Sequence, residues 1–214
     1  MTGRSAAPSS RRRYAVESFR SAAEAIGPVL PGMSVFVLSR GQFSMIDVVQ
    51  HVIAEVVAAS GQPVAVSLWT WCISEYEQEP MAALMANRSI LTATLVIDRS
   101  AEQRSPTTIQ AWRDRFGVES VKVIKNHAKI CTVSNDSYRV LIRGSCNLNF
   151  NPRTENLDVT EGGPDFALVE RIEAEFPVLP PLCSNLQADA ATSLGRAFEQ
   201  STLQMLAGVR VWKP

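Results

Sequence analysis

Short β-branched apolar runs alternate with helical patterns along the chain up to about residue 125. The runs predict β-strands at Ser34 to Ser39, Val64 to Trp69, Leu91 to Ile97 and Val121 to Lys125. Between the first two strands, apolar residues recur at helical spacing from Met45 to Val56, which predicts an amphipathic helix. Helices are also predicted at Glu75 to Asn87 and Ser105 to Phe116. Strands alternating with helices indicate the α/β class.

The pattern changes after Lys125. Two strands, Ala128 to Val133 and Tyr138 to Arg143, are joined by the turn formers Ser134 to Ser137, which predicts a β-hairpin. Helices are predicted at Asp165 to Phe176 and Gln187 to Val209. We therefore expect three parts: a flexible basic arm (1–13), one α/β domain (14–180) and a C-terminal helical extension (181–214).

Composition narrows the function classes. The 214 residues carry 21 Lys and Arg against 21 Asp and Glu, so any anion site must be local. No apolar run approaches the roughly 20 residues that span a bilayer, and no apolar segment follows the N-terminal arginines, so neither a transmembrane segment nor a secretory signal is expected. The cysteines Cys72, Cys131, Cys146 and Cys183 lack metal-site spacing. We expect a soluble, cytoplasmic protein.

Candidate chemistry gathers around the predicted hairpin. Side chains alternate along a strand, so His127 and Lys129 share one face. The second strand returns the chain to this end, where Ser145 and Asn147 follow it. A histidine can attack phosphorus or donate a proton, and lysine and asparagine can hold phosphate oxygens. Glu155 could hydrogen-bond the imidazole. These residue types suit phosphodiester chemistry.

At these residues the chain resembles the phospholipase D superfamily. Its pattern, His-x-Lys followed by Gly-Ser-x-Asn, matches His127-Ala128-Lys129 and Gly144-Ser145-Cys146-Asn147. Glu155-Asn156 looks like the acidic residue and asparagine that follow this pattern in nuclease-type members of the superfamily. The resemblance implies a phospholipase D-like mixed sheet flanked by helices, with one motif per chain. It also implies that His127 is the nucleophile, Lys129 and Asn147 bind phosphate, Ser145 supports the site and Glu155 orients a histidine. No metal or other cofactor is required in that family.

The match has two departures. Ser134 occupies the position of the family aspartate, with Asp136 two residues late, and the stretch from Lys129 to Gly144 is longer than the pattern, which we expect to lengthen the hairpin turn.

Other residues have ordinary interpretations. His51 lies on a polar helix face and is interpreted as a surface histidine. Cys131 and Cys146 are interpreted as packing residues. Trp69, Trp71 and Trp112 suit a core, although Trp69 or Trp71 could border the site.

The sequence thus predicts a metal-independent phosphodiesterase with a phosphohistidine intermediate. Nucleic acid, DNA or RNA, is the expected substrate because the chain is small and lacks any membrane-binding feature; the segment Asn151 to Asn156 also looks like phage or prophage members of the family. The superfamily's two-motif enzymes use two histidines at one phosphate, so a single motif implies a homodimer. The alternatives are a catalytically degenerate nucleic-acid-binding or assembly protein, and a phospholipid hydrolase or transferase.

Overall fold

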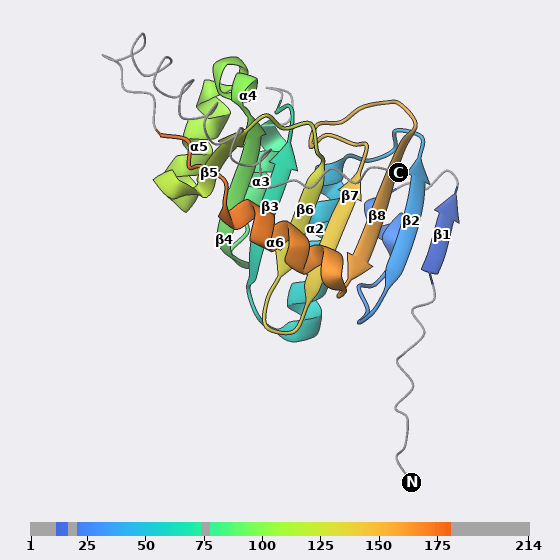
Figure 1. The fold of residues 1–214 in the computed structure, drawn as a ribbon. Helices are drawn as coiled ribbons and strands as arrows, with labels where there is room; N and C mark the ends of the chain where they lie inside the picture. The colour runs from blue at the N-terminus through green and yellow to red at the C-terminus, as the bar shows by residue number, and fades with distance from the viewer. Residues whose placement is uncertain (1–11, 17–20, 74–77, 181–214) are drawn as a thin grey trace, which may run out of the picture. The chain divides into compact units, whose positions relative to one another are not determined.

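The computed structural model describes residues 12–16, 21–73 and 78–180, and these form one mixed sheet with helices on both faces (Figure 1). Within the described residues the sheet has eight strands in the order β1-β2-β8-β7-β6-β3-β4-β5. Their bounds are β1 (Arg12–Val16), β2 (Ser34–Ser39), β3 (Val64–Thr70), β4 (Ile90–Asp98), β5 (Val121–Ile124), β6 (Ile130–Ser134), β7 (Arg139–Gly144) and β8 (Glu155–Glu161). The predicted α/β class with a mixed sheet is confirmed.

Strand direction changes within this sheet. β3, β4 and β5 are parallel, whereas β6 pairs antiparallel with both β3 and β7, and β8 pairs antiparallel with both β7 and β2. The C-terminal ends of β3, β4, β5 and β7 therefore share one edge with the N-terminal ends of β6 and β8. We call this the motif edge; it is the upper edge of the sheet in Figure 1.

The helices divide unevenly between the two faces. They are α1 (Ala22–Ile26), α2 (Met45–Ser60), α3 (Gln78–Ala86), α4 (Arg99–Arg104), α5 (Pro106–Phe116), the short 3-10 helix η2 (Val118–Ser120) and α6 (Pro164–Ala174). Among the described helices only α6 crosses one face, and α2 lies behind the opposite face (Figure 1). The larger hydrophobic cluster contains residues of α1, α2, α3 and α5, so the main core lies on the α2 face.

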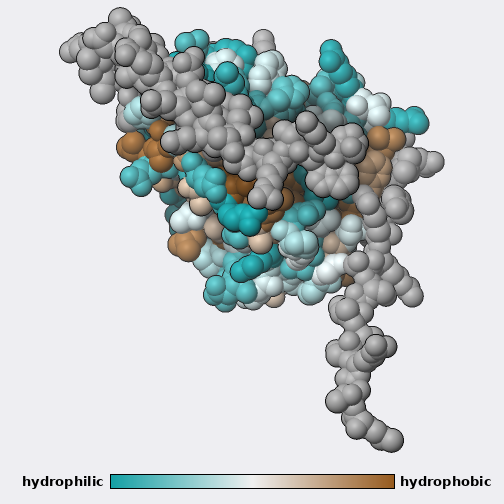
Figure 2. Space-filling model, in the orientation of Figure 1, coloured by the Kyte–Doolittle hydropathy of each residue, from teal (hydrophilic) through white to brown (hydrophobic). Residues whose placement is uncertain are grey.

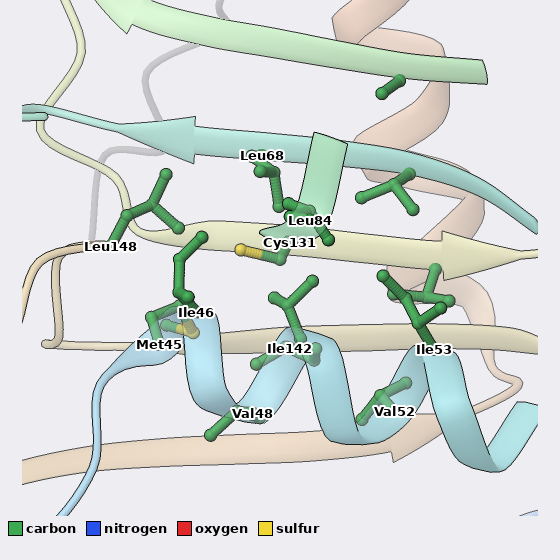
Figure 3. Close-up of a cluster of buried hydrophobic side chains, with 14 of the residues drawn as sticks. Met45, Ile46, Val48, Val52, Ile53, Leu68, Leu84, Cys131, Ile142 and Leu148 are labelled. Carbon is green, nitrogen blue, oxygen red and sulfur yellow. The ribbon is translucent and has the colours of Figure 1, made fainter. Parts of the chain in front are cut away.

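α2 supplies much of this core. Ser44 caps it: the Ser44 hydroxyl accepts from the Asp47 backbone N–H, and the Asp47 carboxylate accepts from the Ser44 N–H at 2.7 Å. Gly61, with φ of 68°, ends it. Apolar side chains of α2 face Leu68, Cys131 and Ile142 of β3, β6 and β7 (Figure 3). The predicted amphipathic helix therefore forms because its apolar stripe is buried against three strands.

The α6 face holds a smaller cluster: Trp69, Val96, Leu141, Phe166, Val169 and Phe176. Trp69 lies 4.9 Å from Phe176 between ring centroids, and its Nε1 donates to the Glu173 carboxylate at 2.6 Å. Hydrophobic patches alternate with hydrophilic surface on this side of the molecule (Figure 2). Trp69 is thus a core residue that helps to dock α6.

Two predictions need correction. Arg12 and Arg13 belong to β1, which pairs in parallel with β2, so the ordered fold begins before Tyr14 rather than after a flexible arm ending at residue 13. His51 is half-buried and lies 2.8 Å from the Gly27 carbonyl oxygen through Nε2, so it joins α2 to the end of α1 instead of lying free on the surface.

Some predictions fall outside the described residues. These are the arm at residues 1–11, the first residues of the helix predicted from Glu75, and the extension at 181–214 with its predicted helix from Gln187 to Val209. The chain divides into a compact unit of residues 1–179 and a second of residues 180–214. No helix in the described part is both long and apolar enough to span a membrane.

Candidate active site

The strand directions bring the motif residues to the motif edge. His127 and Lys129 lie in the connection from β5 to β6, Ser145 directly follows β7, and Glu155 begins β8. Backbone hydrogen bonds join these segments: the Gly144 N–H donates to the Lys129 carbonyl at 3.2 Å and the Ser145 N–H to the Asn156 carbonyl at 2.9 Å. Two sequence segments separated by the hairpin therefore meet at one place.

Asn126 fixes the start of the His-x-Lys segment. Its buried side-chain amide donates to the carbonyls of Thr70 at 3.1 Å and Val96 at 3.4 Å, and its Oδ1 accepts from the Ala128 N–H at 2.8 Å. Its own N–H donates to Asp98 Oδ2 at 3.2 Å. Sequence analysis did not identify this residue. An asparagine directly after a predicted strand was the available signal.

His127 is exposed and lies against the buried Lys129. The Lys129 Nζ is 3.1 Å from His127 Nδ1 and 3.4 Å from Nε2, and it donates to the His127 carbonyl at 2.6 Å. An ammonium group has only donors, so contact with a ring nitrogen requires that nitrogen to be unprotonated. Burial lowers the pKa of Lys129, and the Glu155 carboxylate opposes this shift. The pair thus holds a positive charge beside an accessible imidazole.

Glu155 is bound on the Gly-Ser side of the site. Its carboxylate accepts from the Ser145 hydroxyl and from the Asn151 side-chain amide at 3.0 Å. The Ser145 Oγ in turn accepts from the Asn156 N–H at 3.0 Å. Among the described residues, Glu155 has no hydrogen bond to His127. The expected contact between Glu155 and a histidine is therefore not made inside the single chain, and Asn151 is a partner that sequence analysis missed.

Gly144 is required by the close approach of β7 and β8. A Cβ atom at this position would lie 2.1 Å from the Asn156 carbonyl oxygen and 2.8 Å from Leu157 Cα. Real Cβ atoms essentially never show contacts below 3.0 Å, so only glycine fits without a shift of the backbone. The glycine of the Gly-Ser-x-Asn segment thus sets the spacing that places Ser145 against Asn156 and Glu155.

Asn147 and Asn149 follow Ser145. The side-chain oxygen of each is buried and has no hydrogen-bond partner among the described residues. A buried polar atom without a hydrogen-bond partner lowers folding stability by about 1–3 kcal/mol. Such a cost is more typical of residues in binding sites than of residues that only stabilise the fold. Neither amide is hydrogen-bonded to His127 or Lys129 in this structure. The phosphate-binding role expected for Asn147 stays a prediction.

Ser134, at the position of the family aspartate, lies far from the other motif residues. It ends β6 and pairs with Arg139, at the edge of the sheet opposite the motif edge. At about 3.3 Å per residue, it lies roughly 16 Å along the strand from Lys129. Asp136 is exposed in the turn, which runs from Asn135 to Tyr138. The departure from the family pattern therefore removes no side chain from the cluster around His127.

One residue outside the motif, Trp71, borders His127, and Arg104 contacts Trp71 in turn. Trp71 follows β3, is 36% exposed, and lies 5.7 Å from the His127 ring between centroids. The Arg104 guanidinium carbon lies 4.8 Å from the centroid of the Trp71 ring, and Nη2 donates to the Trp71 carbonyl at 3.1 Å. Of the two tryptophans that could border the site, Trp71 does so and Trp69 is buried in the core. Trp112 is fully buried, as expected.

The nearby cysteines are poor nucleophiles. Cys131 and Cys146 are buried, and burial raises the pKa of both thiols. Their interpretation as packing residues agrees with this burial. Within the described part of the chain, no group of three or more His, Cys, Asp or Glu side chains is arranged to hold a metal ion.

An open depression of about 410 Å³ lies on the Lys129 and Ser145 side of the site. Its lining residues come from the starts of β6 and β8 and the end of β7: Ala128, Lys129, Ile130, Arg143, Gly144, Ser145, Asn156 and Asp158. Lys129 and Ser145 therefore both border this open depression.

No model of a known protein family matches this chain, and no curated protein matches it. Among solved structures, polyphosphate kinase from Porphyromonas gingivalis has a TM-score of 0.49 at 15% identity, covering 80% of this chain and 31% of that one. Phosphatidylserine synthase from Haemophilus influenzae has a TM-score of 0.40 at 13% identity, with 80% and 46% covered. Yeast tyrosyl-DNA phosphodiesterase has a TM-score of 0.37 at 12% identity, with 75% and 39% covered. The chain spans less than half of each of these proteins.

Proposed function

We propose that this chain is a metal-independent phosphodiesterase of the phospholipase D type that cleaves nucleic acid through a phosphohistidine intermediate. One observation carries the proposal: an exposed imidazole, His127, lies 3.1 Å from the buried ammonium of Lys129, at the edge where the Gly-Ser-x-Asn segment also arrives. A nucleophile and a fixed cation at one accessible point are what an anionic diester requires.

Each residue then has a role. A ring nitrogen of His127 attacks phosphorus, the bond to the leaving oxygen breaks, and that oxygen takes a proton from a general acid. Water then attacks the phosphohistidine, gives a proton to the base that the general acid has become, and releases the histidine. Lys129 and Asn147 hold the non-bridging oxygens, whose negative charge grows in the transition state. Ser145 supports this site through Asn156 and Glu155. Because Lys129 supplies the positive charge, no metal or cofactor is needed.

The proton donor is the basis for proposing a homodimer. The chain has two histidines, and His51, on α2, is engaged with the carbonyl of Gly27 at the end of α1. A two-fold axis beside His127 would place a second copy of His127 at the same phosphate, where it protonates the leaving oxygen. Glu155, whose carboxylate can accept further hydrogen bonds besides those from Ser145 and Asn151, would then orient the histidine of the second chain rather than its own. Losing general-acid help costs about 10²–10⁴ in rate. Specific activity that stays constant on dilution to a monomer, followed by light scattering, would refute the dimer.

The direct test is turnover of bis-p-nitrophenyl phosphate by His127→Ala, with His51→Gln as the matched histidine control. We expect His127→Ala to lose at least about 10³-fold in rate with an unchanged circular dichroism spectrum. His51→Gln should keep the rate of the parent. Alkaline quenching should trap an acid-labile phosphoryl group on His127. Turnover by His127→Ala at the parental rate would end this mechanism. Comparing DNA, RNA and phosphatidyl-lipid vesicles decides the substrate class.

A second candidate function is nucleic-acid binding or assembly without catalysis. One observation favours it: the Lys129 Nζ already donates to the His127 carbonyl at 2.6 Å. A well-folded dimer that binds an oligonucleotide but turns over no diester would support this function over the first.

A further inference from the structure

Trp71 and Arg104 form an exposed surface beside His127, here called the ledge. The two side chains come from different elements, since Trp71 follows β3 and Arg104 ends α4. The guanidinium lies over the indole with its carbon 4.8 Å from the ring centroid, and the bond from Nη2 to the Trp71 carbonyl at 3.1 Å holds it there. The indole also lies 5.7 Å from the His127 ring. A planar aromatic and cationic surface therefore adjoins the proposed nucleophile.

The ledge is exposed where a structural tryptophan would be covered. Trp71 is 36% exposed, whereas Trp69, two residues earlier on the same strand, is 6% exposed and Trp112 is fully buried. Arg104 is exposed as well. A guanidinium held by a hydrogen bond to the Trp71 carbonyl has less rotamer freedom left to lose, so a ligand that stacks on it meets a smaller entropic cost.

The charges around the ledge favour stacking over simple phosphate attraction. Asp98 faces Arg104; although burial raises the pKa of this carboxyl, hydrogen bonds from Ser100 and Asn126 and the charge of Arg104 hold it below its usual value. The Asp98 carboxylate is therefore a negative charge that acts on Arg104 and would repel a free phosphate. An indole with a guanidinium over its ring suits a nucleobase, which can stack on both groups.

We propose that the Trp71–Arg104 ledge binds the base of the nucleotide next to the scissile phosphate, which makes the substrate unpaired nucleic acid. This proposal rests on the function proposed above. In a duplex both faces of a base are covered by its neighbours, so only an unstacked base can reach the ledge. A glycerophospholipid has no aromatic ring to place there. The ledge thus determines specificity and is not part of the chemistry itself.

The test compares a single-stranded oligonucleotide with bis-p-nitrophenyl phosphate, using kcat/KM for each. For Trp71→Ala we expect the ratio of oligonucleotide to diester kcat/KM to fall about 5- to 150-fold, mainly through KM, because base stacking adds to ground-state binding. Trp71→Phe keeps a ring and should restore most of the ratio. An abasic nucleotide beside the cleaved bond should lower the ratio for the parent protein and leave little further loss for Trp71→Ala.

Arg104 separates stacking from charge. Arg104→Lys keeps the charge but loses the plane, so stacking predicts that it behaves like Arg104→Ala, whereas charge attraction predicts that it behaves like the parent. Arg88→Ala and Leu91→Ala are the controls, because both residues are exposed near the start of β4, at the opposite edge of the sheet. Both controls should keep the parental ratio.

Failure of the ledge and failure of the proposed function give different results. If the parent cleaves the oligonucleotide but Trp71→Ala leaves the ratio unchanged, or lowers both substrates equally, the ledge proposal is overturned while the nuclease stands. If the parent cleaves nothing, binding of the fluorescent oligonucleotide is measured instead. Binding that depends on Trp71 and prefers single strands over a duplex then supports the ledge without the nuclease; binding indifferent to Trp71 overturns it.

Discussion

Replacing Gly144 by alanine tests how the two halves of the site are held together. The added Cβ would lie 2.1 Å from the Asn156 carbonyl oxygen and 2.8 Å from Leu157 Cα. Ordinary van der Waals contact begins near 3.4 Å, so β7 and β8 must separate by more than an ångström at this point. Both obstructing atoms belong to the backbone, which cannot rotate away as a flexible side chain would.

The cost has two parts. Forcing an extra carbon into a packed interior costs about 1–3 kcal/mol. Separation also stretches the bonds between Ser145 and Asn156, at 2.9 and 3.0 Å, each contributing about 1 kcal/mol net. Together the two parts lower stability by about 1–5 kcal/mol, which corresponds to a decrease in Tm of about 2–20 °C for a chain of this size. Misplacing catalytic groups by about 1 Å costs about 10²-fold in rate, so turnover should fall more than stability alone explains.

The assay is thermal unfolding by circular dichroism together with diester turnover at a temperature where both proteins are folded. Gly61→Asn is the matched control: no atom lies within 4 Å of a Cβ at Gly61, and asparagine tolerates its left-handed φ of +68°. Gly61→Asn should keep full turnover and unfold closer to the parent. A Gly144→Ala protein with the parental Tm and turnover would show that β7 and β8 do not approach as closely as described.

Three further outcomes follow from the same contacts. Asn126→Asp should lower the free energy of unfolding by about 2–4 kcal/mol in urea denaturation, because an ionised carboxylate cannot donate to the Thr70 and Val96 carbonyls. Part of this free energy should return on acidification, as the carboxyl regains a proton. Lys129→Met should remove a rise in stability with pH. Burial lowers the folded-state pKa of Lys129 below its ordinary 10.5, so between these two values the unfolded chain binds more protons and wild-type stability increases with pH; parallel stability–pH curves for the two proteins would contradict this sign. Diester turnover should be unchanged by EDTA, and a loss restored by Mg²⁺ would reveal a metal site instead.

The elements that sequence analysis located well are those whose burial follows a local period. The helix from Met45 has a capping serine, one apolar stripe and a terminal glycine, so residues of one continuous segment determine its start, its buried face and its end. β3 is a nearly continuous buried run and was found for the same reason. The hairpin of β6 and β7 was predicted because its turn residues lie between two apolar strands.

What was missed depends on distant partners. β8 has inward-facing Leu157 and Val159 among polar residues, and it becomes a strand because β2 and β7 flank it. The Arg104 contact with Trp71 likewise depends on how α4 follows β4, which no local pattern reveals. His51 lies on a polar helix face by spacing, but the end of α1 covers it. The residues that repeat a family motif were therefore predictable, and those that support them through tertiary contacts were not.

The turn from Asn135 to Tyr138 is a place where residues can be inserted without disturbing the motif edge. It closes on itself: the Asn135 N–H donates to the Tyr138 carbonyl at 3.0 Å, and the Asn135 side-chain oxygen accepts from the Ser137 and Tyr138 N–H groups. β6 and β7 separate it from the motif edge by their full length. Extra residues relative to a family pattern can accumulate at such a turn while the register of Lys129 against Gly144 is preserved. For the experimenter, the same separation makes Asp136 and Ser137 suitable attachment points for a fluorophore or an epitope that reports on this protein without approaching the motif edge.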